Sequence, residues 1–365
     1  MDIEVNCSSQ SNELAGSLST NASNNNYFSK ELKNLNNLNI CSNTNIIFVP
    51  EKNNNQNEIQ SQSQIQITLT QNDIENQAQI SISNKLSDQK EKEIFNFNFS
   101  SAEESIFFAG EYLNEIYSNL LQDEKDLLYK PKIGYMNMQS DINEQMRAIL
   151  IDWLIEVHYR YRLKSETLYQ TVWIIDTYLS MLPIVRARLQ LLGIASLLIS
   201  CKSQEIYYPQ LNELIDITDG AYVKDELIEI ETHILKVLSF NIVAPTANDF
   251  YNIIAKSFNF DNRQYYLGKY FLESSLIDYQ MIRYPSSVVA VSCAYIVMKF
   301  FGISNYKNLY STDVINESCP QKIIKECARE VCFLVKNLSQ STLKAVKDKY
   351  SLPQFLNVAQ YCEQK

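Results

Sequence analysis

Two stretches of this sequence are apolar on nearly every side of a helix. The first runs from Arg186 to Cys201, and the second begins after Pro285 and ends before Gly302. A helix that is apolar all round is stable in water only when other helices surround it. Each stretch therefore predicts the buried central helix of a bundle, and the two stretches lie about 100 residues apart.

Further helices are predicted on both sides of each central stretch, because apolar residues recur at spacings of three and four. In the first unit the predicted helices run from a cap at Asp141 and Glu144 to Tyr161, from Ser165 to Leu179, from Arg186 to Cys201, onward from Pro209, and from Val223 to Leu238. In the second unit they run onward from Pro245, from Tyr265 to Met281, onward from Pro285, near Asp313, and from Pro320 to Leu338.

The pattern predicts an all-α fold with two tandem five-helix domains, at residues 143–243 and 244–350. A separate N-terminal helix and linker are expected at 101–142, beginning at the capping pair Ser101 and Glu104. Residues 351–365 are expected to form a C-terminal tail. The apolar face of the N-terminal helix is predicted to consist of Ile106, Phe107, Ala109, Tyr112, Leu113, Ile116, Tyr117 and Leu120.

Residues 1–100 have a different composition, dominated by Asn, Gln and Ser. Such a tract has too little apolar surface to offset the entropy of ordering, so we predict a disordered, low-complexity head. The alternating run from Ile65 to Thr70 is typical of a strand. A lone strand has no pairing partner, so the run does not change the prediction.

Composition excludes several classes of function. The net charge of −10 argues against a nucleic-acid partner, because phosphate contacts need Lys and Arg. Only seven glycines occur, too few for the glycine-rich cradles of nucleotide-binding folds. No apolar run reaches the roughly 18 residues that a membrane span needs, so no membrane partner is expected.

No pattern of chemistry-bearing residues indicates an enzyme, a metal site or a cofactor. The two histidines, His158 and His233, lack a second ligand at metal-binding spacing and are predicted at the surface or on helix flanks. Asp152, Glu156 and Asp176 are interpreted as helix-surface charges or caps. The eight cysteines include no C-x-x-C pair and are expected to be reduced. Cys201, Cys293 and Cys332 fall in apolar helical stretches and are expected in the core.

The segment from Met146 to Val157, MRAILIDWLIEV, matches the signature opening of the cyclin box. Further matching segments follow in order, among them Leu189–Gly193, Glu205–Pro209 and Tyr284–Ser286. Over about residues 107–350 the chain resembles mitotic cyclins of the A and B types. The segments 130–136 and 244–246 lean toward the A type, although the two types are hard to separate from these residues.

The resemblance implies a non-enzymatic regulatory subunit that binds and activates a cyclin-dependent serine/threonine protein kinase and docks its substrates. It implies a role in cell-cycle progression, at G2/M or S phase, and a location in the nucleus and cytoplasm. By the same resemblance, Lys202 and Glu231 are the polar anchors of the kinase contact. The apolar part of that contact would consist of Ile199, Leu235, Phe240 and Ile242.

A second site implied by the resemblance is a shallow groove for Arg-x-Leu peptides of substrates and inhibitors. Its apolar stripe is expected to stay partly exposed, with Glu156 pairing with the basic residue of the peptide. The residues that match it are Met146, Ile149, Leu150, Trp153, Glu156, Gln190 and Ile217. By periodicity alone the apolar members are simply core residues, and this alternative stays open.

Three features depart from the family pattern. Ser203 and Gln204 stand where an aromatic or bulky residue and a glutamate are usual, and Thr177 replaces an arginine. The head contains no arginine and no Lys-Glu-Asn triplet, so any cell-cycle proteolysis is expected to use an unconventional signal. Two other functions are considered beside the kinase activator: a cyclin-fold adaptor in transcription, and a helical scaffold that has lost kinase binding.

Overall fold

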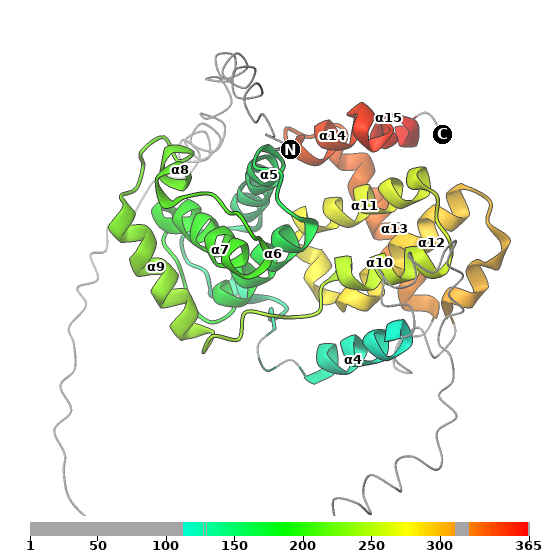
Figure 1. Cartoon of the computed structure of the whole chain (residues 1–365), viewed down its shortest axis with the longest axis horizontal. Helices are drawn as coiled ribbons and strands as arrows, with labels where there is room; N and C mark the ends of the chain where they lie inside the picture. Colours follow the sequence, from blue (N-terminus) through cyan, green and yellow to red (C-terminus); the bar gives the residue numbers. More distant parts are fainter. Residues whose placement is uncertain (1–111, 127, 129, 311–320, 364–365) are drawn as a thin grey trace, which may run out of the picture. The chain divides into compact units, whose positions relative to one another are not determined.

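The computed structural model describes residues 112–126, 128, 130–310 and 321–363. Within these ranges the regular elements are all helical. The first repeat holds α5 (Glu144–Arg160), α6 (Ser165–Leu179), α7 (Leu189–Gln204), α8 (Leu211–Asp216) and α9 (Lys224–Val237). The second holds α10 (Ala247–Ser257), α11 (Asn262–Ile277), α12 (Ser286–Phe300) and α13 (Gln321–Leu338). Helix α4 (Leu113–Asp126) precedes them, and α14 (Ala345–Tyr350) and α15 (Val358–Glu363) follow (Figure 1).

The two apolar stretches are central helices, as predicted. Every residue of α7 from Leu189 to Cys201 is buried, and α7 packs against α5, α6 and α9. Helix α12 is surrounded in the same way by α10, α11 and α13. Burying such helices on all sides removes a large apolar area from water, at about 25 cal/mol per Å².

Helix α5 joins the two repeats. It packs against α6 and α7 of its own repeat and against α11 and α14 beyond it. Eleven of its seventeen residues are buried, because it has neighbours on several sides rather than one. The helix with the family signature is therefore the junction of the fold.

Several predicted helix starts were displaced by a few residues. Asp141 does not cap α5; its carboxylate accepts from the Arg186 backbone N–H at 2.7 Å. Asn143 is the N-cap instead, and its side chain accepts from the Met146 N–H. The predicted cap at Asp141 is therefore wrong, because the Asp141 carboxylate is bound to the Arg186 backbone and Asn143 directly precedes the helix. Helix α6 spans Ser165–Leu179, the predicted range, with Lys164 at its N-cap.

Helix α4 buries a narrower face than predicted. Leu113, Tyr117 and Leu121 are buried, whereas Tyr112 and Ile116 are exposed. Tyr117 packs edge-on against Phe250 of α10, with ring centroids 5.5 Å apart. One neighbouring helix can cover only one stripe of α4. The predicted apolar face therefore included residues that are exposed. The predicted cap at Ser101, the low-complexity head and the short helix near Asp313 lie outside the described residues.

The C-terminal segment contains helices that the sequence analysis did not predict. Helix α15 packs on α11, and its residues Val358 and Ala359 are fully buried. These helices are only six residues long, too short for periodicity to reveal them.

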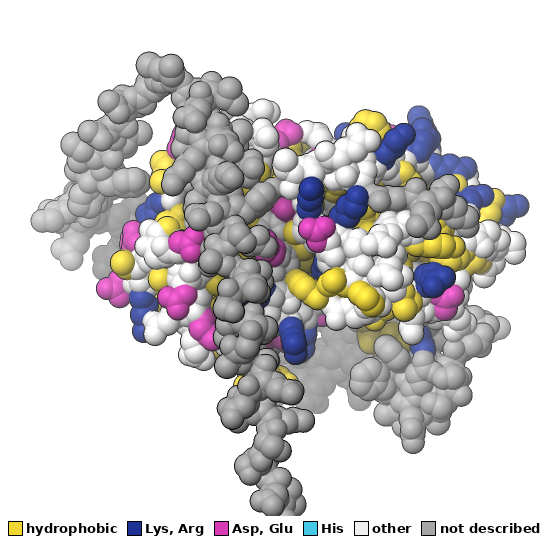
Figure 2. Space-filling view, turned by 90° about the horizontal axis from the view of Figure 1, so that it is seen from above, with side chains coloured by type: hydrophobic (Ala, Val, Ile, Leu, Met, Phe, Trp, Pro, Cys, Tyr) yellow, Lys and Arg dark blue, Asp and Glu magenta, His cyan; other side chains and the backbone are white. Residues whose placement is uncertain are grey.

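The chain's acidity is unevenly distributed between the repeats. Residues 143–243 contain 13 acidic and 9 Lys or Arg side chains, whereas residues 244–350 contain 9 and 13. Figure 2 shows acidic side chains mainly over the first repeat and basic ones mainly over the second. The argument against phosphate-bearing partners, drawn from net charge, therefore applies to the first repeat more than to the second.

Candidate protein-interaction site

Lys202 and Glu231 form an ion pair between two helices. Lys202 lies near the end of α7 and Glu231 on α9, with Nζ and Oε1 2.5 Å apart. The Lys202 side chain is 42% exposed and the Glu231 side chain 12%. An ion pair at the surface contributes only up to about 1 kcal/mol to stability, because water competes for both charges. The Lys202–Glu231 pair therefore contributes little to the stability of the fold.

Phe240 is held at the surface by a strained turn at the end of α9. The Phe240 N–H donates to the Leu235 carbonyl at 2.8 Å, and the Ser239 N–H to the Lys236 carbonyl at 3.1 Å. This is the Schellman arrangement, which usually has glycine at its left-handed position. Here Ser239 has φ 49° and Phe240 φ 60°, and Phe240 is 70% exposed. Left-handed backbone costs a non-glycine residue roughly 1–3 kcal/mol. The turn that holds Phe240 at the surface is therefore strained.

These residues lie next to one another along α9 and the chain that follows it. Glu231 and Leu235 are one turn apart on the same helix face, and the Ile242 N–H donates to the Phe240 carbonyl at 3.1 Å. Leu235 and Ile242 are half-buried. We call this surface the α7–α9 face, defined by Lys202, Glu231, Leu235, Phe240 and Ile242. Ile199, predicted as a surface contact, is only 3% exposed and belongs to the core of the first repeat.

Two glutamines that sequence reasoning did not assign fix the segment after α9. Gln204 Nε2 donates to Gln170 Oε1, and Gln170 Nε2 donates to the Ile242 carbonyl, each at 2.8 Å. Gln204 is one of the departures from the family pattern. Through Gln170, it helps to hold the backbone at Ile242 in place. A groove of about 460 Å³ beside it is lined by residues of α4, α6 and the segment 241–246.

The predicted peptide groove is not exposed. Met146, Ile149, Leu150 and Trp153 are 0–4% exposed, and Gln190 and Ile217 are 6% and 7% exposed. All the apolar members belong to the core of the first repeat, because α5 is packed by helices on several sides. The prediction that this stripe is partly exposed is therefore wrong. Its apolar members are core residues, which is the alternative that periodicity left open. Only Glu156 is partly accessible.

Behind these surfaces lies a buried ion pair that the sequence analysis did not predict. Arg147 Nε and Nη2 donate to the two Asp176 oxygens at 2.6 and 2.7 Å. Tyr135 donates to the same carboxylate, and Arg147 Nη1 donates to the carbonyls of Leu276 and Ile277 in the second repeat. Burial alone would lower the pKa of Arg147, but Asp176 and Tyr135 hold it above the ordinary value. Asp176 is 4% exposed, so its interpretation as a surface charge is wrong.

Asp152 and His158 on α5 are also buried, contrary to prediction. Asp152 accepts from the Ala345 N–H at 3.0 Å, at the start of α14. Burial raises the pKa of Asp152 to about 7. The His158 ring nitrogen Nε2 lies 2.8 Å from the Lys164 carbonyl, and burial together with nearby Lys349 lowers the pKa of His158 to about 4. His233 is exposed, as predicted, and its Nδ1 lies 3.0 Å from the Tyr178 hydroxyl.

Substituting asparagine for Asp152 is expected to stabilise the fold more at pH 8 than at pH 5. The folded pKa near 7 lies above the ordinary value, so the carboxyl contributes stability at low pH that is lost as pH rises through 7. Asparagine retains an oxygen acceptor for the Ala345 N–H and does not ionise. Because about two pH units separate pH 5 from the folded pKa near 7, the gain should be roughly 3 kcal/mol larger at pH 8, at about 1.4 kcal/mol per unit. Urea unfolding at both pH values measures it, and equal gains would contradict the shifted pKa.

Among the described residues, no group of three or more His, Cys, Asp or Glu side chains is arranged to hold a metal ion. Cys201 and Cys293 are buried as predicted, whereas Cys332 is exposed. Helices long and apolar enough to cross a membrane are likewise absent from the part of the chain that the structure describes.

Two family models match the chain in tandem. The model "Cyclin, N-terminal domain" matches residues 115–243, and "Cyclin, C-terminal domain" matches residues 245–364. Together they span about two thirds of the chain. The solved structure of a viral cyclin from herpesvirus saimiri matches with a TM-score of 0.54 and 18% identity, over 60% of this chain and 96% of that one. At this identity the match shows the fold.

Curated relatives are named as B-type cyclins. The chain is 35% identical over 247 residues to "Cyclin-B2-1" of Oryza sativa subsp. japonica, covering 68% of this chain and 58% of that protein. It is 36% identical over 251 residues to "G2/mitotic-specific cyclin-B2" of Bos taurus, covering 68% and 62%. The chain thus spans less than two thirds of the length of these relatives. The lean of two short segments toward the A type finds no support in these names.

Proposed function

This chain belongs to the cyclin family, and on that premise we propose that it is a regulatory subunit that binds and activates a cyclin-dependent serine/threonine protein kinase. It is a regulator and not itself an enzyme. Because relatives are named G2/mitotic-specific, we place its action at G2/M rather than S phase. Nucleus and cytoplasm are its proposed locations, and imaging of a fluorescent fusion through the cell cycle tests them.

The α7–α9 face carries this proposal. It combines an accessible ion pair, Lys202 with Glu231, and an exposed aromatic, Phe240, held in left-handed backbone. Val243 is also 70% exposed, and Ile206 and Tyr207, just after α7, are 81% and 91% exposed. Exposed aromatic and aliphatic side chains beside a charged pair are the composition of a protein interface: apolar contacts supply affinity and charged hydrogen bonds fix the register.

The mechanism is a shift in the population of kinase conformations. An active kinase pairs the lysine of its third strand with a glutamate of its helix C, and its activation loop is ordered. A rigid face that fits only this arrangement binds it more tightly and raises its population. The face is rigid because α7 is fully surrounded and the segment after α9 is tied to α6 through Gln170 and Gln204.

Addition of the full chain to a purified cyclin-dependent kinase tests the function directly. We expect a stable complex on size-exclusion chromatography and about 100-fold more phosphorylation of a histone peptide, the gain from filling an active state populated at about 1%. A complex without added activity would favour the scaffold. Absence of a complex, together with binding to general transcription factors, would favour the transcription adaptor and would overturn the proposal.

We also propose a second role in docking Arg-x-Leu peptides, which rests on the family resemblance and on the accessibility of Glu156. The burial of Met146, Ile149, Leu150 and Trp153 means that a peptide reaches this stripe only if neighbouring residues move. Truncation of Trp153 is an unsuitable test, since removal of a buried tryptophan costs roughly 3–5 kcal/mol through the cavity it leaves.

Charge reversal at Glu156 is expected to reduce phosphorylation of Arg-x-Leu substrates about tenfold, through loss of an attractive ion pair and gain of a repulsive one. Phosphorylation of a short peptide without that motif should be unchanged. The measurement is kcat/KM of the kinase complex on both substrates with Glu156→Lys. The exposed Glu229→Lys on α9 is the matched control. An equal loss on both substrates would remove the docking role.

A further inference from the structure

The outward side of α13 carries a basic stripe that the proposed function does not use. At 3.6 residues per turn, the members of this stripe fall within roughly 80° of arc around the helix axis. They are Lys322, Lys325, Arg329, Phe333 and Lys336. Lys325 is half-buried, and the other four side chains are exposed. We call this surface the α13 outer face.

The α13 outer face is fixed in place by the opposite side of the same helix. Ile324, Val331 and Val335 are buried on that side, where α13 packs against α11 and α12. A helix held in this way cannot turn its cations away from solvent. The outer face is therefore a fixed row about 21 Å long from Lys322 to Lys336, at 1.5 Å per residue.

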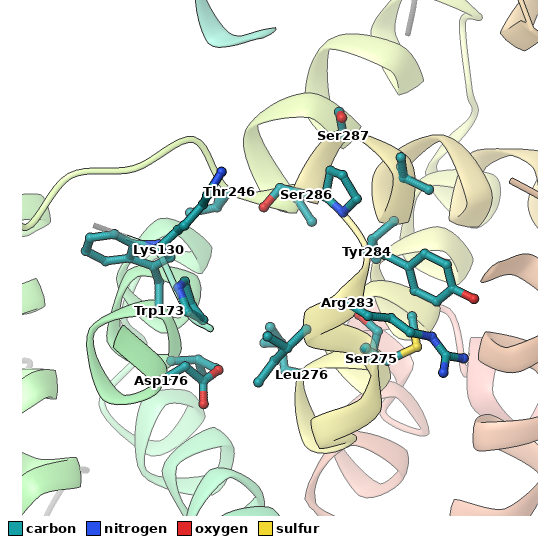
Figure 3. A pocket seen from close by; sticks show the side chains of 18 of the residues that line it. Lys130, Trp173, Asp176, Thr246, Ser275, Leu276, Arg283, Tyr284, Ser286 and Ser287 are labelled. Atoms are coloured by element: carbon teal, nitrogen blue, oxygen red, sulfur yellow. The ribbon is translucent and has the colours of Figure 1, made fainter. Parts of the chain in front are cut away.

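The two acidic residues of α13 lie toward a different neighbour, a pocket of about 780 Å³ between the repeats. Glu326 lines this pocket, and so does Arg283, which Figure 3 shows among the second-repeat residues around it. Glu330 forms an ion pair with Arg283. Even when Glu326 is counted with the outer face, four cations and one carboxylate leave a net charge of +3.

More cations lie at the N-terminal end of the outer face. Lys299, at the end of α12, lies over the Tyr306 ring with its Nζ 3.6 Å from the ring centroid. Tyr306 and Lys307 belong to the 3₁₀ helix η5 (Ser304–Tyr310). A hydrogen bond and charge from Lys299, together with the charges of Lys307 and Lys325, lower the pKa of Tyr306. Cations from three elements therefore converge at this end.

We infer that the α13 outer face binds an acidic peptide segment of a protein partner, with an aromatic or aliphatic residue that packs on Phe333. Lys and Arg donate charge-assisted hydrogen bonds to carboxylates, and these bonds fix the register of the peptide. The Phe333 side chain is 67% exposed, and covering an exposed aromatic adds affinity. About six residues of extended peptide span the row, at roughly 3.3 Å per residue.

Two other anionic partners fit the α13 outer face less well. Proteins that bind single-stranded nucleic acid stack successive bases on several aromatic side chains, whereas this face has one, Phe333. A helix that binds a membrane surface buries its own apolar side in the lipid. The apolar side of α13 is already part of the core of the second repeat. An acidic peptide needs neither feature.

Fluorescence anisotropy with the full-length chain tests the binding in the absence of a kinase. The probe is a fluorescein-labelled peptide of twelve residues, in which glutamates flank a central Leu-Phe pair. We expect micromolar binding that becomes about tenfold weaker between low and high salt, because salt screens exposed charges. Phe333→Ala should weaken binding about tenfold, through loss of the apolar contact.

A triple variant tests the cations of the outer face. Lys322→Gln, Arg329→Gln and Lys336→Gln together should weaken binding about 30-fold, because each exposed ion pair contributes up to about fivefold. The matched control removes the same charge from three exposed cations elsewhere, with Lys224→Gln, Arg263→Gln and Lys344→Gln. The control should stay within about twofold of the unmodified chain. Carbodiimide crosslinks between the glutamates of the probe and lysines of the chain should be found at Lys322, Lys325 or Lys336.

Four outcomes contradict this inference. The probe fails to bind, or both triple variants weaken its binding equally. Alternatively, a twelve-nucleotide oligothymidylate binds more tightly than the probe and loses affinity in the outer-face variant, which would make the face a nucleic-acid site. Phosphatidylserine vesicles that show the same behaviour would make it a membrane site. Because no kinase is present, a failure here is separate from a failure of the proposed function.

Discussion

Replacing Phe240 with alanine is expected to weaken kinase binding at least about 30-fold while the chain stays folded. The side chain is 70% exposed, so its loss leaves no cavity in the core. Buried on a partner, an aromatic anchor of this kind contributes 2 kcal/mol or more, and each 1.4 kcal/mol is a factor of ten in affinity. Isothermal titration with the purified kinase measures the loss, and circular dichroism confirms the fold.

The double variant Lys202→Ala, Glu231→Ala tests the polar part of the same face. It removes both members of the pair, so no unpaired charge is left behind, and stability should change by no more than about 1 kcal/mol. Kinase co-purification should be lost. Phe333→Ala on α13 is the matched control for Phe240, since Phe333 is 67% exposed on the second repeat. If the control and Phe240→Ala weaken binding equally, the α7–α9 face is not the interface.

Strain and contact at Phe240 can be separated by changing the residue before it. Ser239→Gly places glycine at a position with φ 49°, where serine is strained. Ser239→Gly should raise the free energy of unfolding. It should leave kinase affinity unchanged if glycine keeps the same turn and Phe240 stays in the same position. It also shows whether the strained turn exists for stability or for the position of the aromatic ring.

The sequence was most informative where one physical rule acted alone. Leu189 to Cys201 is apolar on all sides, and such a helix has only one stable location, so its burial and its central place were predictable. A second stretch that is apolar on all sides predicted the second bundle in the same way. The ends of helices were less predictable, because Asp141 and Asn143 are both good caps and only the path of the preceding loop decides between them.

Buried charges were the main failure of sequence reasoning. Asp152, His158 and Asp176 are titratable side chains, and the usual interpretation places such groups in water. Their burial depends on partners far along the chain: Ala345 for Asp152, and Arg147 for Asp176. Pairings over such distances leave no local pattern. Gln170 and Gln204 were missed for the same reason, since their hydrogen bonds join three separate segments.

Family resemblance and structure disagree about Met146, Ile149, Leu150 and Trp153. Resemblance implies an exposed docking stripe, whereas all four side chains are at most 4% exposed. From periodicity alone, the four residues could also be core residues. The structure confirms this interpretation. The proposed contact with a kinase does not depend on this stripe, because the α7–α9 face is formed by other helices.

Removal of Arg147 is expected to destabilise the chain by roughly 3–5 kcal/mol, the largest effect of any single substitution proposed for it. Arg147→Ala leaves the Asp176 carboxylate buried, 4% exposed, without its cation. Breaking a buried pair costs this much because the remaining charge cannot reach water. It also removes the donor to the Leu276 and Ile277 carbonyls at the end of α11, which join the second repeat to α5.

Chemical unfolding in urea gives the change in free energy, and hydrogen exchange at the end of α11 gives its location. Arg188→Ala is the matched control, since Arg188 and Glu229 are paired at the surface with side chains 44% and 73% exposed. That change should stay within about 0.5 kcal/mol. Arg147→Met with Asp176→Leu should recover part of the loss, because apolar residues need no partner. If Arg147→Ala costs no more than Arg188→Ala, Arg147 does not join the repeats, and the packing of α5 against α11 and α14 must hold them together alone.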